Sequence, residues 1–182
     1  MSRDFYDLCY DQYKQEMSEA EGLYQKVGVM LLVLPLLGTI MVALGRVDIL
    51  HLGFMRVDVF LYYFASLVAV LALAASVVFL FYCVYPRQYK NIANMDVWHK
   101  WREDYQKHLS AHGEHATGEL ASIDAAMLAN LCLRLAEAQP VNAEINEKRR
   151  KAFKRSVQMA AIALAAIGVQ ALFCLALKLQ GV

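Results

Sequence analysis

The sequence predicts an all-α integral membrane protein with three transmembrane helices and a small helical cytoplasmic domain. Hydrophobic residues make up 59% of its 182 residues, above the share of roughly 45–50% that is usual for soluble domains. Three stretches lack Asp, Glu, Lys and Arg over about the 20 residues that cross a bilayer. The remaining segments repeat apolar residues at helical spacing and show no strand pattern.

The predicted spans are residues 27–45, 58–85 and 156–177. Pro35 lies inside the first span and is expected to kink it, which membrane helices tolerate. The second span is longer than a perpendicular crossing requires, so it can tilt. The uncharged stretches hold 19 residues between Lys26 and Arg46, 28 between Asp58 and Arg87, and 22 between Arg155 and Lys178.

The positions of Lys and Arg predict the orientation of the spans. The first connecting loop offers only Arg46 and Arg56, whereas the segment between spans two and three ends in six cations within eight residues, Lys148 to Arg155. Cytoplasmic segments carry the excess of Lys and Arg near membrane ends. We therefore expect the N-terminus and residues 86–155 to face the cytoplasm and the C-terminus to lie on the other side of the membrane. Besides orienting the helix, this cluster suits anionic lipid or an anionic messenger, and these roles stay open.

Four regions follow from this reading. Residues 1–26 form an amphipathic cytoplasmic helix, and residues 27–85 form a two-span transmembrane hairpin. Residues 86–155 form a helical cytoplasmic domain, and residues 156–182 hold the third transmembrane helix and a short external tail.

The helical pattern also predicts the elements within these regions. The N-terminal helix is expected to run directly into the first span. A helix is expected to leave the membrane over residues 88–109, followed by a loop over 110–118. A second cytoplasmic helix, residues 119–139, is expected to end at a turn marked by Pro140. From Val141 one long helix is expected to continue into the third span.

Aromatic and basic residues alternate on the helix after the second span. Trp98, Trp101 and Tyr105 recur at helical spacing, with Arg102 among them. Nucleobases stack on aromatic side chains while cations neutralise phosphates. These four residues are therefore candidates for binding a nucleotide or a single-stranded nucleic acid. The alternative is that the aromatic rings pack against the helix 119–138 or against a neighbouring subunit.

No catalytic or metal-binding motif is recognisable. His108, His112 and His115 have helical spacing, but Gly113 interrupts the helix that would aim them, so a solvated loop is expected. The four cysteines stand far apart without a paired motif, and we interpret them as small buried hydrophobes. We expect no enzyme activity, no metal and no cofactor.

The spans lack charged residues at their centres, which argues against a pump or a secondary transporter. The polar residues that they do contain are candidates for lining a pore between several copies: Ser66, Ser76 and Gln170. A stripe of small or hydroxylated residues along span two and the Gln residues of span three favour self-association. The stripe comprises Tyr62, Ser66, Ala69, Leu73 and Ser76, and the Gln residues are Gln158 and Gln170. The alternative is tight helix packing without a pore.

The order of elements, together with the segment "N142-AEI-N146-EK-R149-R150", resembles small membrane effectors of bacterial anti-phage systems. These are the SLATT-like and Hailong-type proteins, which are paired with a nucleotidyltransferase. The resemblance implies a homo-oligomeric channel or membrane-disrupting effector that is controlled by a nucleotide or oligonucleotide from the partner enzyme. In this reading the ligand-binding residues of the basic helix are Asn142, Asn146, Arg149 and Arg150, whose amide and guanidinium groups suit base edges and phosphates.

The leading hypothesis is a homo-oligomeric ion channel of the bacterial inner membrane, with a cytoplasmic N-terminus and a periplasmic C-terminus. A tetramer is the copy number considered, and opening of the channel would depolarise the cell during phage infection. Its expected partners are further copies of itself, a nucleotide or oligonucleotide messenger, indirectly a nucleotidyltransferase, and anionic membrane lipids. The alternative is a non-conducting membrane scaffold or lipid-binding adaptor that recruits a cytoplasmic partner through residues 86–155.

Overall fold

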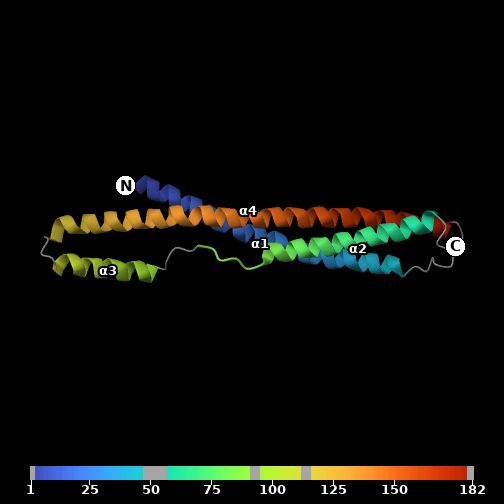
Figure 1. Ribbon diagram of the computed structural model, residues 1–182, viewed down its shortest axis with the longest axis horizontal. Helices are drawn as coiled ribbons and strands as arrows, with labels where there is room; N and C mark the ends of the chain where they lie inside the picture. The colour runs from blue at the N-terminus through green and yellow to red at the C-terminus, as the bar shows by residue number, and fades with distance from the viewer. Residues whose placement is uncertain (1–2, 47–56, 91–94, 112–115, 180–182) are drawn as a thin grey trace. The chain divides into compact units, whose positions relative to one another are not determined.

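The computed structural model describes residues 3–46, 57–90, 95–111 and 116–179. Helices account for nearly all of this part of the chain, and three of them are long and apolar enough to cross a membrane. The predicted all-α membrane fold class is therefore confirmed. The helices, labelled in Figure 1, are α1 (Arg3–Gly45), α2 (Val57–Val84), α3 (Met95–Ala111) and α4 (Ala116–Leu179).

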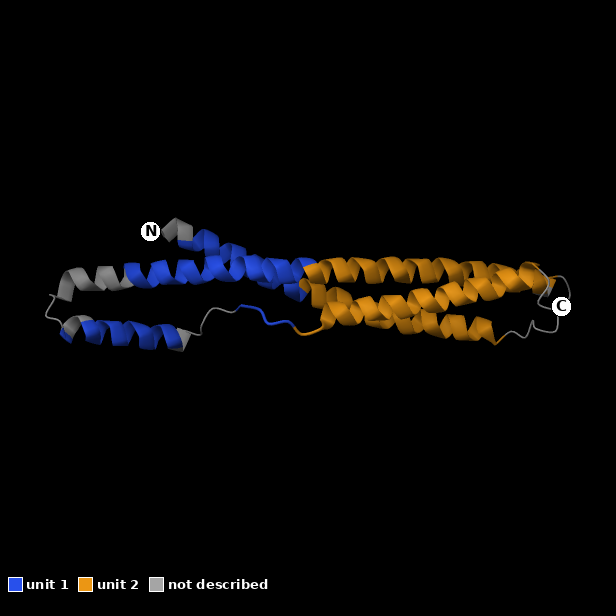
Figure 2. Cartoon of the chain, in the orientation of Figure 1, with its two compact units in different colours: residues 1–21, 87–147 blue, residues 22–86, 148–182 orange. Residues whose placement is uncertain are grey.

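The chain divides into two compact units, drawn in separate colours in Figure 2. Unit 1 consists of residues 1–21 and 87–147, and unit 2 consists of residues 22–86 and 148–182. Helices α1 and α4 each contribute residues to both units. Helix α2, the predicted second span, belongs to unit 2 alone.

Helix α1 confirms that the N-terminal segment and the first predicted span form one continuous helix. Pro35 lies inside this helix and cannot donate a backbone hydrogen bond. One turn later the Thr39 hydroxyl donates to the Pro35 carbonyl oxygen at 2.9 Å.

The helix predicted over residues 88–109 is wrong at its start. Helix α2 ends at Val84, residues 86–90 are not helical, and the next described residues, from Met95, form α3. The last hydrogen bond of helical type runs from the Tyr85 N–H to the Phe81 carbonyl oxygen at 2.8 Å. Pro86 explains the break, because proline lacks an N–H and disfavours helical geometry at the residue before it.

The turn predicted at Pro140 is also wrong, because α4 continues through this residue to Leu179. An interior proline removes one helical hydrogen bond and costs roughly 3 kcal/mol or more. Ala138 and Asn142 on either side are fully buried. Tertiary packing of this stretch therefore outweighs the local preference for a turn.

The buried positions of α4 recur at intervals of three and four residues. This spacing places them along one helical face, and it runs through the cationic cluster without a break. The sequence pattern that marks the face is thus longer than the third span alone. The face comprises Cys132, Leu135, Ala138, Asn142, Asn146, Arg149, Ala152, Ser156, Ala160, Ala163, Ile167, Gln170, Cys174 and Leu177.

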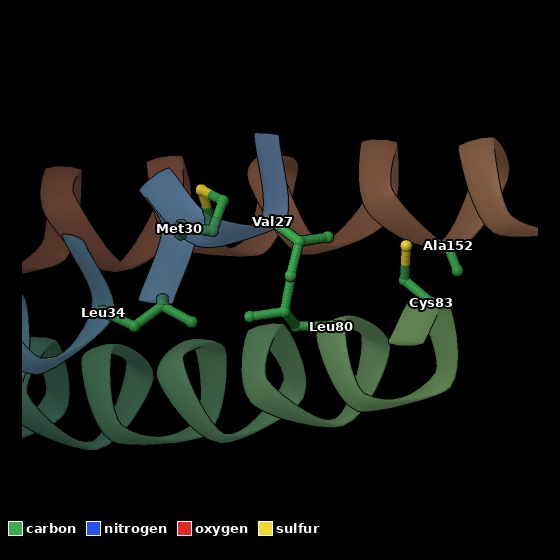
Figure 3. Packing of buried hydrophobic residues seen from close by; sticks show 7 residues of the cluster. Val27, Met30, Leu34, Leu80, Cys83 and Ala152 are labelled. Atoms are coloured by element: carbon green, nitrogen blue, oxygen red, sulfur yellow. The ribbon is translucent and has the colours of Figure 1, made fainter. Parts of the chain in front are cut away.

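The core of unit 2 joins α1, α2 and α4. In the cluster of Figure 3, Val27 of α1 and Leu80 of α2 point toward one another. A neighbouring cluster places Ala69 of α2 with Ala166 and Ile167 of α4. Small side chains allow helices to approach closely. The small-residue stripe predicted to drive self-association therefore packs largely within one copy of the chain.

Candidate functional site

Asn142 is a completely buried amide in unit 1. Its Oδ1 accepts a hydrogen bond from the Lys90 N–H at 2.9 Å, and its Nδ2 donates to the Lys90 carbonyl oxygen at 3.1 Å. Lys90 lies in the non-helical segment after Pro86, so its backbone groups have no helical partners. The Asn142 amide satisfies both of them, which ties this segment to α4.

Asn146 binds the same non-helical segment and also α1, within unit 1. Its Oδ1 accepts from the Tyr89 hydroxyl at 2.7 Å. Its Nδ2 donates to both the carbonyl oxygen and the Oε2 of Glu16, each at 2.8 Å. The two predicted amides thus form a connected polar network that joins α1, residues 89–90 and α4. Their predicted role in ligand binding stays a prediction, and a ligand would have to compete with these contacts.

An ion pair borders this network. The Lys90 ammonium group lies 3.0 Å from Oε2 of Glu137. The hydrogen bond from Lys90 and the positive charge of Lys90 lower the pKa of the Glu137 carboxyl below its ordinary value. Because this carboxyl is exposed to solvent, the pair contributes little to stability.

Arg149 is 1% exposed and lies in the core of unit 2. Its Nε donates to the Cys83 carbonyl oxygen at 2.8 Å, and its Nη2 donates to the Tyr24 hydroxyl oxygen at 2.6 Å. Cys83 lies in the last turn of α2, where carbonyls lack helical partners and the helix dipole favours a cation. The Arg149 guanidinium also lies 4.6 Å from the centroid of the Tyr24 ring, within range of a cation–π contact. One cation therefore joins all three helices of unit 2.

The rest of the basic cluster behaves differently from Arg149. Lys148, Arg150, Lys151, Lys154 and Arg155 are exposed. Arg150, the second predicted guanidinium ligand, is therefore open to solvent while Arg149 is enclosed.

Ser76, a predicted pore-lining residue, packs inside unit 2. Its hydroxyl donates to the Ser156 carbonyl oxygen at 2.8 Å, and the Ser156 hydroxyl donates to the Ser76 carbonyl oxygen at 2.9 Å. Both residues are completely buried. Ser66, the second predicted pore residue, is only half-buried and has no place in this pair.

Gln170, the third predicted pore-lining residue, has an unusual environment. It is 0% exposed, and neither Oε1 nor Nε2 has a hydrogen-bond partner. Tyr62 lies near this amide, but its hydroxyl donates to the Leu44 carbonyl oxygen, and neither amide atom of Gln170 reaches hydrogen-bond geometry with it. A buried amide without a partner costs roughly 1–3 kcal/mol. Gln170 is therefore a polar group in a predicted span that this arrangement leaves unsatisfied.

The aromatic candidates lie on α3 in unit 1. Trp101 and Tyr105 stack with ring centroids 5.2 Å apart, and Trp98 meets Trp101 edge-on at 6.4 Å. Trp98 is buried, whereas Trp101, Arg102 and Tyr105 are half-buried. Much of the ring surface is thus already in contact within the chain, and the predicted stacking on a base stays a prediction.

Sequence reasoning missed the partners of the buried polar groups. The unbroken spacing of the α4 face could have indicated that Arg149 and Ser156 point inward. No sequence signal marks a backbone carbonyl as the partner of a side chain. The missed partners are Glu16, Tyr24, Cys83, Tyr89, Lys90 and Ser156.

The structure tests the prediction of buried cysteines, whereas most of the predicted histidine loop lies outside the described residues. Cys83, Cys132 and Cys174 are buried, as expected for small hydrophobes, and Cys9 is partly exposed. His112 and His115 lie outside the described residues. Among the residues that the structure does describe, no three His, Cys, Asp or Glu side chains gather as metal ligands.

A comparison with protein families matches residues 25–176, most of the chain, to the model described as PycTM: Pycsar effector protein domain. No curated protein and no solved structure matches the chain. The family match supports the resemblance to an anti-phage membrane effector, but it does not confirm the SLATT-like or Hailong-type assignment. The chain belongs to the PycTM family of Pycsar effector protein domains, which makes it a membrane effector of anti-phage defence.

Proposed function

We propose that this effector is a homo-oligomeric ion channel of the bacterial inner membrane that depolarises the cell when a nucleotide or oligonucleotide messenger binds. The observation that carries the proposal is Gln170, an amide in a predicted span that is buried without a partner. Polar groups inside a membrane are energetically expensive and are typical of functional positions. Water in an open pore would satisfy this amide, and so would another copy of the chain.

The described arrangement of unit 2 is the closed one in this proposal. The hydroxyl of Ser76 is occupied by Ser156, and Gln170 is enclosed. Opening would break the contact between the two serines and expose Gln170 to water. On closing, rings of apolar side chains would exclude water from the pore. Ser66, which is half-buried, would join the pore lining only in the open state.

The messenger would act through unit 1 by competing for the amides of Asn142 and Asn146. Both now bind groups of their own chain, so a ligand that takes over these contacts favours a different arrangement of unit 1. A ligand shifts an equilibrium only through its difference in affinity for the two states. About 3 kcal/mol of coupling would shift the equilibrium roughly 150-fold. Trp98, Trp101, Arg102 and Tyr105 are the proposed stacking and phosphate contacts on α3.

The basic cluster, Lys148 to Arg155, indicates how the proposed channel is oriented in the membrane. Cytoplasmic placement of residues 86–155 follows from the excess of Lys and Arg there. It would let unit 1 meet a messenger made by a nucleotidyltransferase without direct contact between the two proteins. Reporter fusions near Lys100 and at Val182 should report opposite compartments, and a single compartment for both would overturn the topology.

The direct test is the membrane potential of bacteria that produce the protein together with its messenger source, followed with a potential-sensitive dye. The parent chain should depolarise the cells. Gln170→Leu should abolish the response, whereas the matched variant Gln158→Leu, at an exposed position of the same helix, should retain it. An unchanged potential in every ligand state removes the channel claim, and equal effects of both variants remove Gln170 from it.

The rival function is a non-conducting scaffold or lipid-binding adaptor. The packing of the small-residue face of α2 inside unit 2 favours it, because that face is then not available for close contact between copies. This rival predicts an oligomer or monomer that binds a cytoplasmic partner and leaves the membrane potential unchanged.

A further inference from the structure

A groove of about 300 Å³ lies on unit 2 between the last turns of α2 and the basic part of α4. This volume is at the lower end of the range of roughly 300–1,000 Å³ in which ligand sites fall. Its lining combines apolar and aromatic residues with cations. The apolar and aromatic part comprises Val78, Phe79, Tyr82 and Ala152, and the cations are Lys148, Lys151 and Arg155.

The three cations share one face of α4. They follow each other at intervals of three and four residues, which stacks them along the helix. Arg155 reaches toward α2, because its guanidinium carbon lies 5.8 Å from the centroid of the Phe79 ring. The cationic side of the groove thus extends over its aromatic side. Arg150 and Lys154, on the same helix, do not line it.

The groove lies where the charged part of α4 gives way to its apolar part. The 22 residues after Arg155 carry no charge, which corresponds to about 33 Å of helix at 1.5 Å per residue and matches a hydrocarbon core of about 30 Å. Lys148 to Arg155 spans about 10 Å of helix. The headgroup layer is roughly 5–8 Å thick on each side, so these cations fall at the depth of lipid phosphates.

We propose that this groove binds the headgroup of an anionic phospholipid, with the phosphate among Lys148, Lys151 and Arg155 and the start of an acyl chain along Val78 and Phe79. Three cations complement the phosphate charge. Val78 is 65% exposed, so an apolar surface is available beside them. Basic pockets between transmembrane helices are known to hold anionic headgroups.

The lining favours a lipid over a soluble phosphate compound. A nucleotide presents a base whose polar edge needs hydrogen-bonding side chains. Besides the three cations, the described lining offers one polar side-chain group, the Tyr82 hydroxyl. A lipid instead needs an apolar surface continuous with the membrane, which Val78 and Phe79 supply. The proposal is independent of messenger control, because it concerns only unit 2.

The test uses the full chain purified in detergent and native mass spectrometry. Phosphatidylglycerol and phosphatidylcholine with the same acyl chains are titrated separately. A direct hydrogen bond from a cation to the phosphate contributes at least about tenfold in affinity. The double variant Lys151→Gln with Arg155→Gln should therefore bind phosphatidylglycerol about 100-fold more weakly and bind phosphatidylcholine as the parent does.

The matched control is Arg150→Gln with Lys154→Gln, which removes the same charge from exposed positions outside the groove. It should stay within about twofold of the parent, because these side chains lie outside the groove and make no direct bond to the phosphate. Equal losses in both double variants would overturn the site in favour of diffuse attraction to the whole basic cluster.

Two further arms separate the sources of phosphate. Val78→Trp fills the apolar side and should weaken phosphatidylglycerol binding without changing any charge; unchanged binding would overturn the acyl contact. Inorganic pyrophosphate should not displace the lipid at equal concentration, and displacement would assign the groove to a soluble anion. If the membrane potential does not change in the dye test but the lipid-binding results are as expected, the channel proposal is wrong and the lipid site is retained. If the potential changes but the lipid-binding results are not as expected, only the lipid site is wrong.

Discussion

The two units of the chain treat buried amide side chains in opposite ways. In unit 1, Asn142 and Asn146 are buried and bonded on both their oxygen and nitrogen atoms. In unit 2, Gln170 is equally buried and bonded on neither. All three lie on the same buried face of α4. The difference therefore comes from the elements opposite them and not from the helix that carries them.

This contrast shows what holds each unit in its arrangement. A fully satisfied buried network favours one arrangement, because any shift leaves polar groups without partners. The core of unit 2 combines apolar packing with the satisfied contacts of Arg149 and of the pair Ser76 and Ser156, and Gln170 weakens it. An arrangement that gave this amide a partner would recover part of that loss. The polar contacts of unit 1 thus favour a single arrangement. Unit 2 would gain stability from a second arrangement in which Gln170 has a hydrogen-bond partner.

The largest expected effect concerns Arg149, the buried cation in the core of unit 2. Arg149→Met removes the hydrogen bonds to Cys83 and Tyr24, and bonds to charged groups contribute roughly 1.5–3 kcal/mol each. We expect the free energy of unfolding to fall by about 3 kcal/mol, measured by circular dichroism of the detergent-purified protein. Arg150→Met, at an exposed position, should change it by less than about 0.5 kcal/mol. Equal stability of the two variants would show that Arg149 does not hold the helices together.

The next effect is specific to unit 1. Asn142→Leu keeps the volume but leaves the Lys90 N–H and carbonyl without their partner, which we expect to cost about 2 kcal/mol. Both tryptophans of the sequence, Trp98 and Trp101, lie in unit 1. Their fluorescence should therefore show that unit 1 unfolds at a lower temperature in the variant than in the parent. A transition at the parent temperature would contradict the role given to this amide.

Gln170→Leu should act in the opposite direction and sharpen the comparison. Removing an unsatisfied amide from an apolar core should raise the free energy of unfolding by about 1 kcal/mol. Circular dichroism should show the gain, whereas tryptophan fluorescence from unit 1 should change little. If this variant is less stable than the parent, Gln170 has a partner in the membrane and the contrast between the units disappears.

The smallest expected effect is a dependence on pH in unit 1. The hydrogen bond and charge of Lys90 lower the pKa of Glu137 below 4.5. A lowered folded pKa means that the pair stabilises the unit above about pH 4.5 and that this contribution is lost as the pH falls through the folded pKa. At pH 6, tryptophan fluorescence should show a slightly lower unfolding temperature for Glu137→Gln than for the parent. Below the folded pKa the difference from the parent should vanish, and a difference that persists there would exclude this pair as its cause.

The sequence was sufficient for the fold class because long uncharged stretches leave few alternatives in a bilayer. It was insufficient at Pro140, where local turn chemistry lost to the burial of Ala138 and Asn142. It was also insufficient at Arg149, because a cation within a basic cluster normally faces solvent. Gln170 could be singled out as a polar residue in a span, but whether a partner lies in hydrogen-bond geometry with its amide is decided by tertiary packing. That packing leaves no pattern in the sequence.

The paired serines of unit 2 have a practical consequence. Their hydroxyl oxygens lie 3.0 Å apart, one on α2 and one on α4, so cysteines at both positions would bring two thiols into bonding range. Oxidation would then join α2 and α4 by a disulfide bond in the arrangement described here, and a reductant would break that bond. Such a redox-controlled staple would let an experimenter hold the effector inert in living cells and restore its freedom to move at a chosen moment.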